Sequence, residues 1–315
     1  MILEDADIPA RAPVSVLVLT RNEEANIAEC LESLRWAAEV LVVDSLSTDR
    51  TAEIAEALGA KVCPHAFAGY ADQRNWALQN LPFAYDWVLM IDADERIPGA
   101  LAHEIRKAVS RSNDTYSGFY ISRRLFFMGR WLRHGGLYPT WLLRLFKRQL
   151  ARVEERPVNE HVIVNGRVGY LGQPLDHVDR RPLSDWVAKQ NRYAGLQAAE
   201  YLREKSRKGF ESSIRASLRG SQAERKRWIK LHVWNRLPLL VRPFLFFARN
   251  YFLKAGFLDG RAGFIYHVLW SFWVKFLIDV KVIERQSGVG RPGGTAWSLD
   301  HLGRGDSKSE KVTAS

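Results

Sequence analysis

Residues 14–20 read VSVLVLT, an unbroken apolar run of strand length, and the polar stretch RNEE follows directly. Such a run fits a strand that is covered on both faces, as strands of parallel sheets are. Asn22 can cap a helix after this strand, and Glu23 and Glu24 then stand in its first turn, where acidic side chains are favourable. We therefore expect a buried strand, a tight turn and a helix at the start of the domain.

The same alternation continues over the first hundred residues. The predicted strands are residues 40–43, 61–64 and 87–91, and the predicted helices are residues 51–59 and 71–81. Strands separated by short helices imply right-handed crossovers and a mainly parallel α/β sheet. In such sheets ligands bind beyond the carboxyl ends of the strands, and Asp44, Asp92 and Asp94 all fall at strand ends.

The character of the chain changes from about residue 116. Segments such as FYISRRLFFMGRWL and LLRLFKR indicate antiparallel strands, and residues 184–205 indicate a helix capped by Ser184. The last thirty residues are rich in Gly, Ser and charge, which is typical of disorder. We expect an α/β domain over 12–182, a basic, aromatic-rich helical region over 183–285 and a disordered tail over 286–315.

The charge of the chain is unevenly distributed, and this indicates which partners the chain can bind. The 315 residues are 47% hydrophobic and carry a net charge of +11. Residues 1–110 hold nine Lys and Arg against 18 Asp and Glu, whereas residues 111–315 hold 37 against 17. A basic half of this kind suits an anionic membrane, an anionic substrate or nucleic acid. Two isolated cysteines and the absence of an apolar leader at the N-terminus predict a reducing, cytoplasmic location.

The sequence Asp92-Ala93-Asp94 directly follows an apolar strand. Alternation along an extended chain points both carboxylates to the same side, where they suit a hard divalent cation that also holds a diphosphate. Such a cation neutralises the charge that develops on a departing nucleoside diphosphate. The alternative is a turn in which these acids only cap the next helix.

Three stretches together carry a resemblance to a known family. SVLVLTRNEEANIAECLESL, VLVVDSLSTDRT and VLMIDADER occur in this order and resemble the family 2 glycosyltransferases, over roughly residues 14–180. The resemblance implies the GT-A fold, a Rossmann-like, mainly parallel sheet with a smaller antiparallel portion. It also implies a nucleotide-sugar donor, here expected to be UDP-linked, and a Mn²⁺ or Mg²⁺ ion.

The resemblance assigns donor-binding roles to residues at the strand ends. Thr20, Asn22 and Glu23 match the T-x-N-E stretch after the first strand, and Asp44 matches the acid that contacts the nucleoside. Asp92 and Asp94 match the family's DxD motif, in which Asp92 also contacts the donor and the second acid typically ligates the metal. Asn22 as a plain helix cap and Asp44 as a plain turn acid are the alternatives.

Three further segments match the family less closely. Arg74 and Asn75 fit a G-x-x-x-x-R-N helix start that approaches the donor, and a solvated surface arginine is the alternative. His177 would be a nitrogen ligand of the metal or a hydrogen-bonded structural residue. The double glycine in HGGLYP, residues 134–139, would let backbone approach a sugar closely or form a tight turn.

An inverting transfer needs one general base to deprotonate the acceptor hydroxyl. The family takes this base from an acid downstream of the DxD motif, and the best match is Glu160 in RPVNEH. Because this segment departs from the more common E-D element, Glu154 and Glu155 remain competitors. A carboxylate among hydrophobic strands has a raised pKa, which favours a base.

Residues 225–285 interleave Arg and Lys with many aromatic residues. The most apolar window, residues 262–278, is 17 residues long, at the short limit for a membrane span. We therefore expect helices that lie in the membrane interface and face anionic lipid. The alternatives are a buried helical subdomain, a dimer contact or a transmembrane helix. A nucleic-acid site is not expected, because aliphatic residues outnumber isolated stacking aromatics.

The whole pattern resembles the bacterial lipopolysaccharide-core glycosyltransferases of family 2. The resemblance implies transfer of a hexose, for example glucose from UDP-glucose, to a lipid-linked saccharide at the cytoplasmic face of the inner membrane, by a peripheral or monotopic enzyme. A polyprenyl-phosphate glycosyltransferase, a catalytically inactive sugar- or nucleotide-binding protein and a membrane scaffold are the alternatives.

Overall fold

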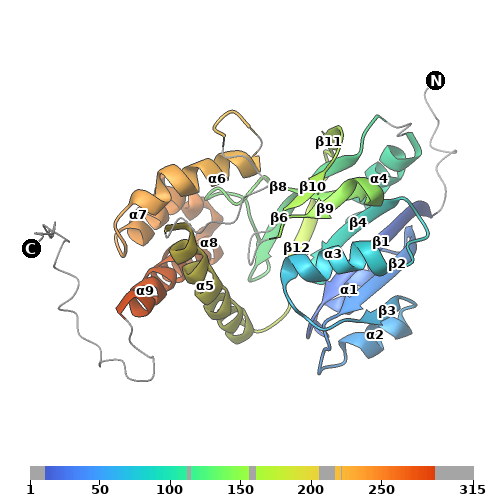
Figure 1. Cartoon of the computed structure of the whole chain (residues 1–315), viewed down its shortest axis with the longest axis horizontal. Helices are drawn as coiled ribbons and strands as arrows, with labels where there is room; N and C mark the ends of the chain where they lie inside the picture. Colours follow the sequence, from blue (N-terminus) through green and yellow to red (C-terminus); the bar gives the residue numbers. More distant parts are fainter. Residues whose placement is uncertain (1–10, 112–114, 156–160, 206–216, 221, 288–315) are drawn as a thin grey trace, which may run out of the picture.

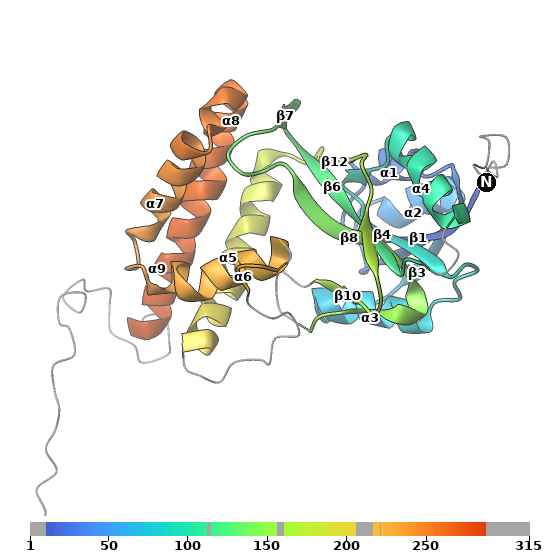
Figure 2. The ribbon, with the colours of Figure 1, turned by 90° about the horizontal axis from the view of Figure 1, so that it is seen from above.

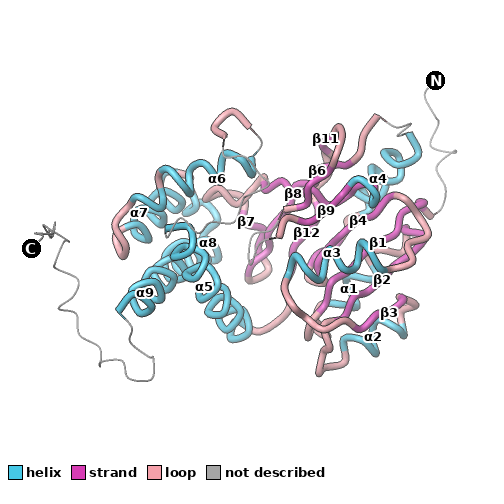
Figure 3. Tube along the Cα trace, viewed as in Figure 1, coloured by secondary structure: helices cyan, strands magenta, loops and turns pink. Residues whose placement is uncertain are grey.

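A computed structural model describes residues 11–111, 115–155, 161–205, 217–220 and 222–287 (Figure 1). The described chain has two parts that lie side by side. The described residues between 12 and 178 form a sheet with flanking helices, and a group of helices follows from residue 183 (Figure 3).

The parallel half of the sheet has the order β3-β2-β1-β4. Its strands are β1 (Ala12–Thr20), β2 (Ala37–Asp44), β3 (Lys61–Pro64) and β4 (Trp87–Asp92). The helices between and after them are α1 (Ile27–Glu32), α2 (Thr51–Ala57), α3 (Tyr70–Asn80) and α4 (Gly99–Arg111). The predicted mainly parallel α/β sheet is confirmed.

A portion with mostly antiparallel pairings extends this sheet beyond β4, so that ten described strands belong to it. The added strands are β5 (Glu95–Arg96), β6 (Gly118–Phe127), β7 (Arg130–Leu132), β8 (Thr140–Lys147), β11 (Val168–Tyr170) and β12 (Leu175–Val178). A 3₁₀ turn, η2 (Arg148–Leu150), leads into a separate hairpin of β9 (Ala151–Val153) and β10 (Val162–Val164). The smaller antiparallel portion that we expected is therefore present.

The central strands are apolar throughout because both faces of the sheet are covered. In β1, Val16 and Val18 belong to one buried cluster, whereas Leu17 and Leu19 belong to a second cluster. The first cluster packs under α1 and α4, and the second packs under α3 and the β9–β10 hairpin. Alternate side chains of one strand thus enter two different cores, which explains the unbroken run VSVLVLT.

The helical part packs largely on itself. Its elements are α5 (Leu183–Lys205), α6 (Gln222–His232), η3 (Trp234–Arg236), α7 (Arg242–Ala248), η4 (Arg249–Leu253), η5 (Gly256–Asp259), α8 (Gly260–Tyr266), η6 (His267–Trp273) and α9 (Val274–Ser287). Ala194 and Ala198 of α5 are buried against Val274, Ile278 and Val282 of α9, and each set repeats at a spacing of four residues. Figure 2 shows α8 and α9 running end to end at the side away from β1 to β3.

Candidate active site

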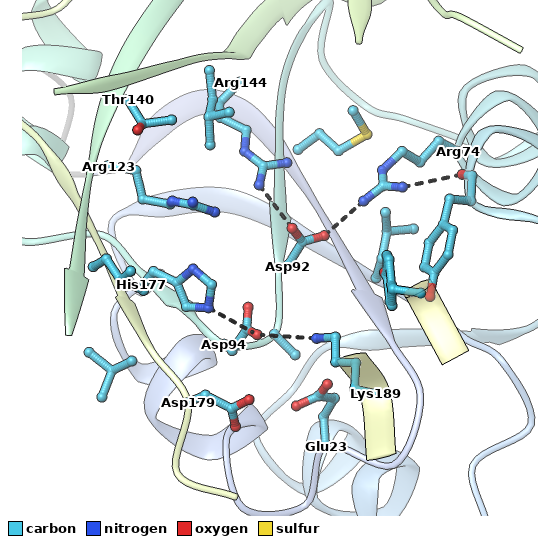
Figure 4. Close-up of a pocket in the computed structure, with 18 of the residues that line it drawn as sticks. Glu23, Arg74, Asp92, Asp94, Arg123, Thr140, Arg144, His177, Asp179 and Lys189 are labelled. Atoms are coloured by element: carbon cyan, nitrogen blue, oxygen red, sulfur yellow. Dashed lines mark hydrogen bonds and ion pairs between the residues drawn. The ribbon is translucent and has the colours of Figure 1, made fainter. Parts of the chain in front are cut away.

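A cleft of about 2000 Å³ opens at the carboxyl ends of β1 and β4 and is walled on one side by α5. The side chains that line it include most of the residues expected from sequence. They are Thr20, Asn22, Glu23, Arg74, Asp92, Asp94 and His177, together with Arg123, Arg144, Arg181 and Lys189. Figure 4 shows the acidic pair and the basic residues around it facing one cavity.

Asp92, the last residue of β4, is held by two guanidinium groups. Arg74 of α3 places Nη2 3.0 Å from Oδ1, and Arg144 of β8 places Nη2 2.9 Å from Oδ2. Burial alone would raise the pKa of Asp92, but the charges of Arg144 and Arg74 outweigh it and lower this pKa to about 2. Asp92 is therefore ionised at any physiological pH, and its charge is balanced within the protein.

Arg144 reaches this position because β8 carries a bulge. Phe119 pairs with Leu145 while Tyr120 pairs with Leu143, so Arg144 is the extra residue in the β8 strand. A bulge redirects side chains locally, and here the same Nη2 also lies 2.7 Å from Oε1 of the buried Glu95. One arginine thus ties the first acid of the DxD motif to the short strand that follows it.

Asp94 faces a different set of partners from those of Asp92. Its Oδ2 lies 3.3 Å from Nε2 of His177 on β12 and 3.9 Å from both Nη2 of Arg181 and Nζ of Lys189. Burial would raise the pKa of Asp94, but His177, Lys189 and Arg181 together hold it well below its usual value. The carboxylate is ionised and surrounded by positive and nitrogen-bearing groups.

The donor set of Asp94 and His177 fits a divalent metal ion. A carboxylate oxygen and an imidazole nitrogen meet at the cleft surface, and both are ligands that Mn²⁺ accepts. Within the described residues no group of three or more His, Cys, Asp or Glu side chains is placed to hold an ion. Ions such as Mg²⁺ use one or two protein carboxylates and take other ligands from substrate phosphates and water, so two protein ligands suffice.

Glu23 helps to hold the guanidinium group of Arg181 beside Asp94. Its Oε1 lies 2.7 Å from Nη1 of Arg181, and its Oε2 accepts a hydrogen bond of 2.8 Å from Asn26. Asp179 binds the same guanidinium through Nη2 at 2.7 Å. Burial, followed by the charge of Asp94, raises the pKa of Glu23 to about 7.

The loops after β1 and β2 are clamped to each other. The carboxylate of Asp44 accepts hydrogen bonds from the Thr20 hydroxyl at 2.9 Å and from the Ser47 backbone at 2.8 Å. Asn22 has a positive φ of 54°, and its Oδ1 accepts a bond of 2.8 Å from the Thr48 backbone. One aspartate, Asp44, and one asparagine, Asn22, therefore hold the two loops together at the ends of the parallel strands.

Asn75, another expected site residue, is not among the residues that line the cleft. Both ends of the Asn75 amide bind the backbone of Val153, at 2.9 and 2.8 Å, so this side chain fixes β9 to α3. Glu160 lies outside the described residues. Of its competitors, Glu154 is buried and forms an ion pair with Arg227 of α6 at 3.0 Å, whereas Glu155 is exposed.

Sequence reasoning did not identify Arg144, Arg181 or Lys189 as site residues. Lys189 comes from the helical region and Arg181 from the segment before it, more than 80 residues after the DxD motif. Arg144 had a usable signal, because a charged residue inside the apolar run WLLRLF requires a buried partner. The other two could be recognised only once the chain was folded.

Comparisons with known proteins place the chain in a family. The family model "Glycosyl transferase family 2" matches residues 15–173, just over half of the chain. The lipopolysaccharide core biosynthesis glycosyltransferase LpsC of Rhizobium meliloti is 27% identical over 289 residues, which are 90% of this chain and 96% of that protein. An uncharacterized glycosyltransferase of Rickettsia bellii is 28% identical over 284 residues, 86% of each chain.

Among solved structures, S. aureus TarS 1-349 superposes with a TM-score of 0.42 at 17% identity, covering 87% of this chain and 91% of that chain. The match of the family model decides the assignment. The protein is a glycosyltransferase and belongs to glycosyl transferase family 2.

Proposed function

We propose that the protein is an inverting, metal-dependent hexosyltransferase that takes its sugar from a UDP-linked donor. The acceptor is a lipid-linked saccharide such as the lipopolysaccharide core, and the enzyme works at the cytoplasmic face of the membrane. The observation that carries the proposal is the convergence of Asp94 and His177 in one cleft with the arginine-bound Asp92.

The donor's diphosphate would lie between the two acidic positions. Asp94 and His177 would hold a Mn²⁺ or Mg²⁺ ion, which supplies charge neutralisation for the departing diphosphate. Lys189, whose ammonium lies 3.9 Å from Asp94, and Arg123 are cations of the same cleft that can contact phosphate oxygens. We expect the nucleoside of the donor to bind beside Thr20, Asn22 and the loop after Asp44.

We propose Glu160 as the general base. The strands on either side of its segment, β9 and β10, contribute Val153 and Val162 to the lining of the cleft. Glu154 is already engaged by Arg227 and is 2% exposed, so it is poorly suited to take a proton from an acceptor. The base removes the acceptor hydroxyl proton while the oxygen attacks the anomeric carbon and the bond to the diphosphate breaks.

The lipid-linked acceptor is supported by the surface of the helical part. The π-helical turn η4 and the turn η5 present Phe252, Leu253, Phe257 and Leu258 to solvent, with Leu253 84% exposed. Arg249, Lys254 and Arg261 are exposed along the same segment. Exposed apolar side chains flanked by cations are typical of helices that lie in an anionic membrane interface.

Within the described residues, the helix of 32 residues from Gly256 to Ser287 is long and apolar enough to cross a membrane, and its most apolar window of 18 residues has a mean hydropathy of 1.3. Its Val274, Ile278 and Val282 are buried against α5, which a separate span would not allow. We therefore propose interfacial attachment through the exposed segment from Phe252 to Leu258.

The catalytic proposal is tested with a panel of nucleotide sugars, Mn²⁺ and a lipid A–core acceptor, with released nucleoside diphosphate as the readout. Release that requires both Mn²⁺ and one donor supports the assignment. Release with polyprenyl phosphate as the acceptor, and no release with the lipid A–core acceptor, would instead identify a polyprenyl-phosphate glycosyltransferase. The absence of release with every donor and acceptor would contradict the proposed activity.

Membrane attachment is tested by flotation with vesicles of phosphatidylethanolamine and phosphatidylglycerol. Leu253→Asp places a charge at the most exposed apolar position and should abolish flotation of the full chain. Leu58→Asp, at an exposed leucine on the sheet part, is the matched control and should float as the wild type does. Equal flotation of both variants would refute attachment through this segment.

A further inference from the structure

Three aromatic side chains from three strands converge in the active-site cleft. Tyr120 of β6 and Tyr170 of β11 are partners in register, and their ring centroids lie 5.0 Å apart with planes inclined by 21°. Trp141 of β8 meets Tyr170 edge-on, at 5.0 Å and 89°. All three line the cleft that also holds Asp92 and Asp94. We call this group the aromatic platform.

The platform is not a part of the described hydrophobic cores. None of its three rings belongs to the buried clusters of the sheet or of the helices, within the described residues. Tyr170 is 58% exposed, which leaves much of a large ring in contact with water. Aromatic surface gathered in a cleft in this way marks a binding site more often than a packing defect.

A helix of the other part of the molecule is bonded to the backbone that carries Trp141 of the platform. The side chain of Gln222, on α6, accepts a hydrogen bond of 3.1 Å from the Trp141 backbone and donates one of 3.1 Å to the Pro139 carbonyl. Glu224 of the same helix also lines the cleft, close enough to Tyr120 for its charge to raise the pKa of that hydroxyl, after the larger effect of burial. The backbone that carries the Trp141 ring is therefore held in place before a ligand arrives, which lowers the cost of binding.

We propose that the aromatic platform is the subsite for a sugar ring of the acceptor, and this inference rests on the proposed glycosyl transfer. One face of a pyranose carries C–H groups of slight positive charge, which pack on the negative face of an aromatic ring. Its hydroxyls would meet the polar groups that line the cleft beside the platform, among them Gln222 and Glu224 of α6. The pairing of aromatic faces with acid and amide groups fits a saccharide better than an acyl chain, which needs apolar walls.

The platform belongs to the acceptor and not to the donor because of its place in the sheet. Tyr120, Trp141 and Tyr170 lie on strands β6, β8 and β11, which extend the sheet beyond β4, whereas the donor residues follow the parallel strands β1, β2 and β4. The cleft continues from one set to the other. A saccharide on the platform therefore extends toward the acids from the side opposite the nucleoside residues.

The test is binding of a deacylated core oligosaccharide from a rough lipopolysaccharide, followed by saturation-transfer NMR, which does not require turnover. We expect saturation of sugar C–H protons by the wild type and at least a fivefold weaker affinity for Tyr170→Ala. Tyr170→Phe keeps the ring face and should bind as the wild type does. Tyr85→Ala, which removes a tyrosine outside the cleft, is the matched control, and melting temperatures verify that each variant is folded.

Kinetics separate this inference from the proposed function. In the Mn²⁺-dependent assay, Tyr170→Ala should raise the acceptor KM about fivefold or more and leave the donor KM and donor hydrolysis unchanged. Equal oligosaccharide binding by the wild type and Tyr170→Ala would overturn the subsite even if transfer is confirmed. Binding of decyl chains without binding of the oligosaccharide would also overturn it. Failure of donor hydrolysis in the wild type would instead contradict the proposed activity, while the NMR result still decides the subsite.

Discussion

Gly135 lies directly against His267, two residues that are 132 positions apart in the chain. A Cβ atom at Gly135 would be 2.1 Å from Nε2 of His267, and the φ of Gly135 is +69°. Its backbone N–H donates a hydrogen bond of 2.8 Å to the Lys254 carbonyl, and the neighbouring His134 binds Asp259 through Nδ1 at 2.8 Å. The HGG segment before β8 is thus a contact between the sheet part and the helical part, and its first glycine makes room for an imidazole.

This contact predicts a strong effect of Gly135→Ala on stability. The added methyl group meets the fully buried His267, and a non-glycine residue at positive φ adds backbone strain, so we expect a loss of about 2–4 kcal/mol in the free energy of unfolding. Gly129→Ala is the control, because Gly129 has a similar φ of +72° but nothing within 4 Å of a Cβ. Urea unfolding measures both variants. Equal losses would show that strain alone, and not the contact with His267, governs this position.

The metal site gives a second prediction. Asp94→Asn removes the charge that the ion requires, and His177→Ala removes a nitrogen ligand, so Mn²⁺-dependent binding of UDP should be lost in the first and weakened at least tenfold in the second. Isothermal titration calorimetry with Mn²⁺ and UDP measures both effects. Asp86→Asn, at an exposed acid outside the cleft, should bind as the wild type does. Full binding by Asp94→Asn would show that the ion is held elsewhere.

The base assignment gives a third prediction. Glu160→Gln keeps the shape of the side chain but cannot accept a proton, so transfer should fall at least 100-fold while Mn²⁺-dependent UDP binding persists. Glu155→Gln, at a neighbouring exposed acid, is the matched control and should retain turnover. Turnover of Glu160→Gln near the wild-type rate would assign the base to another acid.

The strands and their ends were predictable, whereas several site contacts were not. The alternation of apolar runs and short helices predicts β1, β2 and β4, and the carboxyl ends of parallel strands necessarily meet at one edge of the sheet. The bulge that turns Arg144 toward Asp92 depends on the pairing of β6 with β8, and no local pattern encodes that register. Lys189 reaches Asp94 only through the packing of α5 beside the sheet. Long-range geometry of this kind is absent from sequence periodicity.

Arg144 gives a fourth prediction, on the buried network beside the DxD motif. Arg144→Met leaves Glu95, whose side chain is 1% exposed, without this cation, so we expect a loss of about 3 kcal/mol in stability. Adding Glu95→Gln to Arg144→Met removes the uncompensated charge and should recover part of this loss. A double-mutant cycle by urea unfolding measures the coupling. Arg35→Met, at an exposed arginine, is the control, and strictly additive effects at 144 and 95 would argue against the network.

Lys275 gives a fifth prediction, on the pH dependence of stability. Its ammonium lies 4.8 Å from the Trp270 ring centroid, and burial, followed by the charges of Lys230 and Arg242, lowers its pKa from 10.5 to about 8 despite the opposing charge of Asp279. Because the folded pKa is below the unfolded one, the unfolded chain binds more protons between about pH 8 and pH 10.5, and Lys275 makes stability rise with pH in that window.

Relative to Lys275→Met, the wild type should therefore gain about 1–2 kcal/mol of unfolding free energy from pH 7.5 to pH 10. Urea unfolding at both pH values measures this difference. Lys281→Met, on the same helix, should follow the wild type. A parallel pH profile for Lys275→Met and the wild type would show that this ammonium titrates as it does in the unfolded chain.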